Sequence, residues 1–100
     1  MPGWKVTGSI KTLKDQELDE SLIRLFPNPT NGRLTVVTGV SEPVTLRVTD
    51  MAGRVVLVTT TSGEQTEVDL SGIAPAMYIL ELTRDNKVFR KKLIKITKEN

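Results

Sequence analysis

Apolar and polar residues alternate with a period of two along much of the chain, which is typical of strands that bury one face. The clearest stretch is Val44–Thr49, and the same alternation returns in Met77–Thr83. We expect the inward-facing side chains of these two strands to form the core, and these are Val44, Leu46, Val48, Tyr78, Leu80 and Leu82.

Further short strands are expected wherever apolar or β-branched residues stand between turn signals. The expected strands are Leu22–Phe26, Arg33–Thr38, Val44–Thr49, Arg54–Thr60, Glu67–Leu70, Met77–Thr83 and Val88–Thr97. They follow one another at roughly 8–12-residue spacing, with no helical segment between them. The pattern predicts an all-β protein, an antiparallel β-sandwich of about seven strands.

The phase of the last expected strand is ambiguous because apolar residues fall on both of its faces. The two sets, separated by parity, are Val88, Ile94 and Ile96 on one face, and Phe89 and Leu93 on the other. A β-bulge offsets the alternation by one residue. We therefore expect a bulge near Arg90–Lys92 that puts both sets to use.

The first 21 residues differ in composition from the rest. Trp4–Thr12 alternates like a half-buried strand, and Lys14–Glu20 is polar and strongly charged. Helix caps are poor here, so we interpret residues 1–21 as an upstream linker or tail and residues 22–100 as a separate domain. A short helix with Leu18 and Leu22 on one side is the alternative.

Two prolines impose the strongest local constraint in the chain. Pro27 and Pro29 fix their own φ angles, lack amide donors and push the residues before them towards extended geometry. Asn31 and Gly32, which follow, are residue types that readily take positive φ. We expect a rigid extended corner followed by a tight turn, with an ordinary inter-strand loop as the alternative.

A second turn is expected at Asp50–Gly53. An aspartate can cap its own turn, and a glycine three residues later is free to adopt a left-handed conformation. The segment stands between two expected strands, so it predicts a short hairpin loop.

Composition and charge restrict the possible functions. The 100 residues make one domain, with 38% hydrophobic and 26% charged residues and a net charge of +2. Residues 84–100 hold seven basic residues against two acidic ones, a local charge of +5. Only Phe89 stands near these basic residues as a stacking aromatic, which argues against nucleic-acid binding. Protection of an exposed strand edge and recognition by another protein both remain open.

The residue inventory argues against catalysis. Histidine and cysteine are absent, which removes the Ser-His-Asp triad, imidazole and thiolate metal ligands, and disulfides. No glycine-rich phosphate loop is present, and no apolar run reaches the roughly 18–20 residues of a membrane span. We therefore expect no enzyme activity, cofactor, metal, small-molecule substrate or membrane span.

Four sequence blocks, taken in order and with their spacing, resemble a known family. They are Phe26–Arg33, Asp50–Arg54, Met77–Leu80 and Lys91–Lys95. Over about residues 22–97 the chain resembles the type A C-terminal sorting domain of the type IX secretion system, also called the Por secretion system. The resemblance implies an immunoglobulin-like sandwich that acts as a non-catalytic export signal.

The resemblance also implies partners and a location. The domain is expected to be recognised by the outer-membrane machinery of type IX secretion. A sortase then usually removes it and joins the upstream cargo domain to surface lipopolysaccharide. Residues 1–21 would be the tail of that cargo and would contain or border the cleavage region. The cargo is exported through the periplasm to the cell surface or the extracellular space.

Individual residues carry over from the family motifs. Recognition by the translocon is implied for the terminal block, which consists of Lys91, Lys92, Leu93, Ile94 and Lys95. An architectural role is implied for Pro27, Asn28, Pro29, Gly32, Asp50, Gly53 and Tyr78. In one departure, Ala76 stands where the family usually has glycine, so the local backbone is either ordinary β or strained.

Two other functions fit the same fold. A passive adhesin-type or spacer sandwich would need no terminal block. A glycan-binding module usually presents exposed aromatics, whereas this chain offers few, and we expect Tyr78 to be buried.

Overall fold

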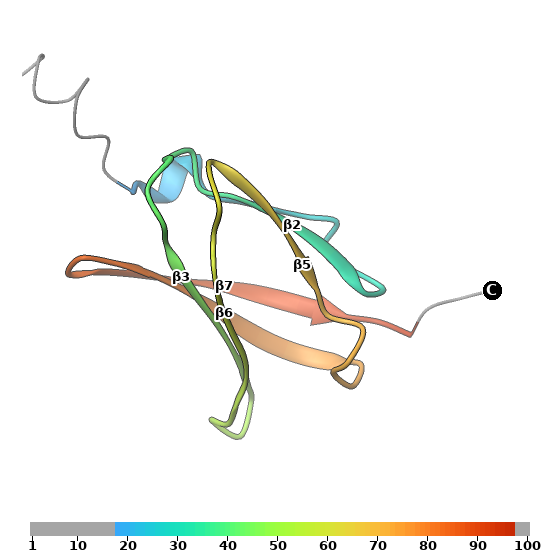
Figure 1. Cartoon of the computed structure of the whole chain (residues 1–100). Helices are drawn as coiled ribbons and strands as arrows, with labels where there is room; N and C mark the ends of the chain where they lie inside the picture. The colour runs from blue at the N-terminus through green and yellow to red at the C-terminus, as the bar shows by residue number, and fades with distance from the viewer. Residues whose placement is uncertain (1–17, 98–100) are drawn as a thin grey trace, which may run out of the picture.

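The chain folds into a sandwich of two antiparallel sheets (Figure 1). The computed structural model describes residues 18–97, and within them the sheets have the strand orders β1-β2-β5 and β4-β3-β6-β7. The elements are η1 (Glu20–Leu22), β1 (Arg24–Phe26), β2 (Arg33–Val37), β3 (Thr45–Asp50), β4 (Val55–Thr60), β5 (Gln65–Asp69), β6 (Ala76–Arg84) and β7 (Lys87–Lys95). The predicted all-β, immunoglobulin-like sandwich is confirmed, whereas the strand expected at Trp4–Thr12 lies outside the described residues.

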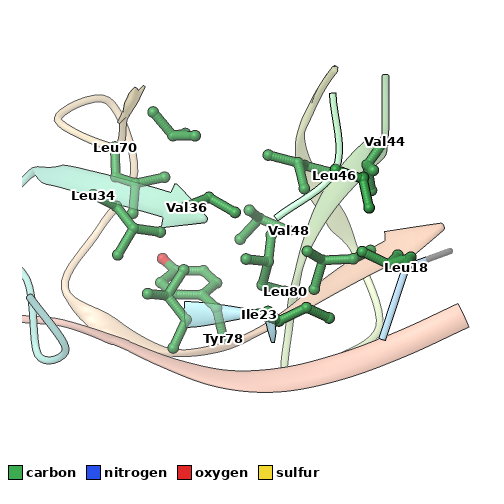
Figure 2. Packing of buried hydrophobic residues seen from close by; sticks show 14 residues of the cluster. Leu18, Ile23, Leu34, Val36, Val44, Leu46, Val48, Leu70, Tyr78 and Leu80 are labelled. Atoms are coloured by element: carbon green, nitrogen blue, oxygen red, sulfur yellow. The ribbon is translucent and has the colours of Figure 1, made fainter. Parts of the chain in front are cut away.

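The core lies between the two sheets, where alternate residues of the strands meet (Figure 2). Leu34 and Val36 of β2 face Val48, Leu80 and other side chains of the four-stranded sheet. All six residues that the alternation predicted for the core are buried: Val44, Leu46, Val48, Tyr78, Leu80 and Leu82. Period-two patterning was therefore sufficient to identify the inward faces of β3 and β6.

The last strand corrects one prediction. No bulge occurs at Arg90–Lys92, because β6 and β7 stay in unbroken register from Ala76–Lys95 to Arg84–Lys87. Odd-numbered residues of β7 face the core, and even-numbered apolar residues face outwards. The sequence was ambiguous because apolar side chains occupy both faces of this strand. A register shift does occur elsewhere, between Val48 and Thr49 where β3 pairs with β4.

The packed unit includes residues upstream of the domain start predicted at residue 22. Leu18 is 2% exposed and belongs to the core cluster. Asp19 caps η1 by accepting a hydrogen bond from the backbone N–H of Ser21 at 3.1 Å. Ile23, directly after η1, is also buried. Residues 18–23 are thus held against the sandwich through an apolar anchor at each end.

Candidate functional site

The proline corner lies along the outer edge of β7. The side-chain amide of Asn28 donates to the carbonyl of Lys92 at 2.9 Å and accepts from the N–H of Ile94 at 3.0 Å. One asparagine side chain therefore occupies backbone groups that a neighbouring strand would otherwise bond. The Phe26–Pro27 and Asn28–Pro29 peptide bonds are both cis.

Thr30 continues this contact and is fully buried. Its N–H donates to the carbonyl of Ile94 at 2.9 Å, and its carbonyl accepts from the N–H of Ile96 at 2.8 Å. Its hydroxyl donates to the carbonyl of Arg33 and accepts from the N–H of Gly32, which shapes the turn into β2. Thr30 thus joins the two sheets. Sequence analysis missed this residue, although a threonine before Asn-Gly is a signal for a side-chain-stabilised turn.

The β3–β4 hairpin forms as predicted around Asp50. Its carboxylate accepts hydrogen bonds from the N–H groups of Ala52 at 2.9 Å and Arg54 at 2.8 Å. The backbone N–H of Arg54 is the main reason why the pKa of Asp50 lies below its ordinary value. Gly53 has φ +92°, the left-handed region that a turn of this kind needs.

Tyr78 ties the β5–β6 loop to the sandwich. Its ring is buried, and its hydroxyl donates to the carbonyl of Ala74 at 2.5 Å. Ala76 lies in β6, and Asp85 is the one non-glycine residue with positive φ among the described residues. The alanine at the family's usual glycine position therefore adopts an ordinary strand conformation.

The terminal block divides between the two faces of β7. Leu93 is fully buried, and Lys95 is 8% exposed with its ammonium group donating to the carbonyl of Ile73 at 2.9 Å. Lys91 points the same way and pairs with Glu20 at 3.1 Å. Lys92 is exposed and Ile94 half-buried on the opposite face. Only these two residues of the block present their side chains to the outer face of the four-stranded sheet.

An ionic row crosses that outer face. Glu81 on β6 accepts from Arg47 on β3 at 2.8 Å and from Arg90 on β7 at 3.1 Å. The hydrogen bonds from Arg47 are the main reason why the pKa of Glu81 lies below its ordinary value, and the charge of Arg90 adds to the effect. Sequence analysis did not predict this row, because its members come from three separate strands.

A family profile described as "Secretion system C-terminal sorting domain" matches residues 24–96. The chain belongs to this family of sorting domains. A comparison with curated proteins found no match. The match runs from β1 to the residue after β7, so it covers both sheets of the sandwich.

Membership of the sorting-domain family has consequences for function. The sorting domain is a signal for type IX secretion, which implies interaction with that machinery and export to the cell surface or beyond. Sorting-signal domains of this family are generally non-catalytic. None of the helices in the described part of the chain is long and apolar enough to cross a membrane. Within residues 18–97, no group of three or more acidic side chains could hold a metal ion.

Proposed function

We propose that the type IX machinery recognises this sorting domain through the terminal block, Lys91–Lys95. One observation carries the proposal: Asn28 and Thr30 bind the backbone of residues 92, 94 and 96, so the proline corner fixes the position of the block. The first motif of the family, Phe26–Arg33, then holds the strand that contains the last one. A pre-ordered element binds with less loss of conformational entropy than a loose tail would.

A reporter fused ahead of the whole chain tests this proposal. In a type IX-secreting host the parent fusion should reach the cell surface, and in an isogenic host without the outer-membrane translocon it should stay in the periplasm. Lys91→Ala with Lys92→Ala should leave the reporter in the periplasm while the purified domain still unfolds cooperatively. Truncation after Lys92 should do the same, but it also removes the buried Leu93. If the folded lysine variant reaches the surface as efficiently as the parent, the terminal block is not the recognised element.

We further propose that a sortase removes the domain and joins the cargo to surface lipopolysaccharide. A protease or sortase needs an extended, accessible stretch of chain, and Leu18 and Ile23 are both buried. We therefore place the cleaved bond on the N-terminal side of Leu18. Mass spectrometry of the released domain should find an N-terminus at or before residue 18. A released fragment that begins after Ile23 would contradict this position.

The alternative functions receive no specific support. The ring of Tyr78 is buried and its hydroxyl is bonded to Ala74, so it offers no stacking platform for a sugar. A passive spacer would leave the reporter in the periplasm of both hosts. The same fusion experiment therefore separates a sorting signal from a spacer.

A further inference from the structure

The outer face of the four-stranded sheet carries an apolar patch beside the terminal block. In register, Met77 faces Ile94 across β6 and β7, and Ile79 faces Lys92. Ile96 follows β7 and is 46% exposed, while Met77 is 41% exposed. The outer face of an antiparallel sheet is ordinarily polar. We name the four side chains Met77, Ile79, Ile94 and Ile96 the outer patch.

The ionic row limits the outer patch on one side. The paired residues Arg47, Glu81 and Arg90 form the next cross-strand row on this face after Ile79 and Lys92. Two exposed valines lie away from the outer patch on the same face: Val58 pairs with Arg47 of the row, and Val88 lies beyond the row. A third, Val55, lies on β4, with Thr49 of β3 between it and Ile79. None of these three valines adjoins the terminal block, whereas Met77 and Ile79 of the outer patch pair directly with its residues Ile94 and Lys92.

The charged side chain that pairs with a residue of the outer patch is positive. Lys92 is exposed and lies in register with Ile79. On this face of the described strands the one carboxylate is that of Glu81, which already binds Arg47 and Arg90. A partner that covers the outer patch would therefore bring the ammonium group of Lys92 out of water. It would have to supply a carboxylate to compensate for that loss of solvation.

The edge of β7 is closed at this end. The carbonyl of Lys92, both backbone groups of Ile94 and the N–H of Ile96 are bonded to Asn28 and Thr30. A partner cannot add a strand here without displacing the proline corner. The side chains of the sheet face are what remains available for docking.

From these observations we infer that the outer patch and Lys92 form the surface that docks onto an outer-membrane component of the type IX machinery. The docking surface of that component is apolar and places a carboxylate opposite Lys92. The inference rests on the proposed function and deepens it. It moves the recognised surface from a linear block to one face of the sheet, with Met77 and Ile79 on β6 as new members.

Matched double variants in the reporter fusion test the outer patch. Met77→Ser with Ile96→Ser changes two side chains that are 41% and 46% exposed, and Val58→Ser with Val88→Ser changes two that are 58% and 45% exposed on the same face. The first pair should lower surface delivery about tenfold or more, the size expected for residues central to an interface. The second pair should deliver the reporter like the parent. Urea unfolding of each purified domain checks that both pairs are folded.

Charge variants at residue 92 test whether the partner places a carboxylate opposite Lys92. Lys92→Glu should lower surface delivery at least as much as the loss of the apolar side chains, because it places two like charges opposite each other. Lys92→Arg keeps the positive charge and should deliver the reporter like the parent. Equal delivery by the Glu and Arg variants would show that the partner places no carboxylate opposite Lys92.

The outcomes separate the inference from the function on which it rests. If the parent fusion is not delivered, the proposed function fails. If the parent is delivered and the Met77/Ile96 variant is delivered equally well, the docking surface is overturned while the sorting function stands. Equal losses in both double variants would overturn the patch as the specific site. If light scattering shows a dimer of the parent that the Met77/Ile96 variant abolishes, the occupant is a second copy of the chain, and the inference is overturned.

Discussion

The side-chain oxygen of Asn28 accepts a hydrogen bond from the backbone N–H of Ile94 at 3.0 Å, across 66 positions of sequence. This contact joins the first sequence motif of the chain to the last. It also explains why the terminal block has a defined position on an edge strand that has β6 as its one strand neighbour in the described chain.

Asn28→Ala should lower the free energy of unfolding by about 1–2 kcal/mol, because two hydrogen bonds to Lys92 and Ile94 are lost at a solvent-accessible edge. Asn31→Ala is the matched control, since Asn31 is exposed in the same loop and takes no part in these bonds. It should change stability by less than about 0.5 kcal/mol. Urea unfolding measures both, and equal midpoints would show that the hydrogen bonds of Asn28 do not stabilise the fold.

Two lysines of the terminal block should respond differently to the same substitution. Lys95→Ala should cost about 1–3 kcal/mol, because it leaves the carbonyl of Ile73 without its donor and removes a buried stem. Lys92→Ala should stay within about 0.5 kcal/mol, because Lys92 is exposed. Lys95→Met keeps the stem and should recover part of the loss. A Lys95→Ala midpoint equal to that of Lys92→Ala would contradict the structural role of Lys95.

A pair of glycines isolates the effect of backbone conformation. Gly53 has φ +92° and Gly72 has no positive φ, while a Cβ added at either would meet no atom within 4 Å. Gly53→Ala should therefore cost about 1–2 kcal/mol through strain alone. Gly72→Ala should leave stability unchanged or raise it by up to about 1 kcal/mol, through lower entropy of the unfolded chain. Thermal and urea unfolding of both variants check the difference, and equal values would contradict it.

The ionic row should make stability depend on pH. The pKa of Glu81 is lowered in the folded protein, chiefly by Arg47, so its stabilisation is present above the ordinary value of 4.5. That stabilisation is lost as the pH falls through the lower folded-state pKa. Glu81→Gln and Arg47→Met should each flatten the acid limb of the unfolding free energy, whereas Arg24→Met, at an exposed position on β1, should not.

Two carboxylates outside the row also make stability depend on pH, so the flattening in these variants should be incomplete. The pKa of Asp50 is lowered mainly by the backbone N–H of Arg54, and that of Asp69 mainly by the backbone N–H of Ser71. Some acid sensitivity should therefore remain in both variants of the row. If Glu81→Gln unfolds along the same pH curve as the parent, the row does not stabilise the folded state.

Local patterning by itself determined the fold class, most strand positions and the centre of the core. Side chains of a strand alternate between faces, so Val44–Thr49 and Met77–Thr83 revealed their inward residues without any long-range information. The turn chemistry of Asp50 and Gly53 likewise depends on residues within one hairpin, and it was predicted correctly.

Tertiary structure alone decided the geometry of the site. Apolar residues occupy both faces of β7, so only its pairing with β6 shows that Leu93 points inwards and Ile94 outwards. A lysine in a basic run reads as solvent-exposed, yet Lys95 is buried because the carbonyl of Ile73 lies within reach of its ammonium group. The bond between Asn28 and Ile94 depends on how the two sheets pack. Such contacts form between segments far apart in the chain, and no local pattern specifies them.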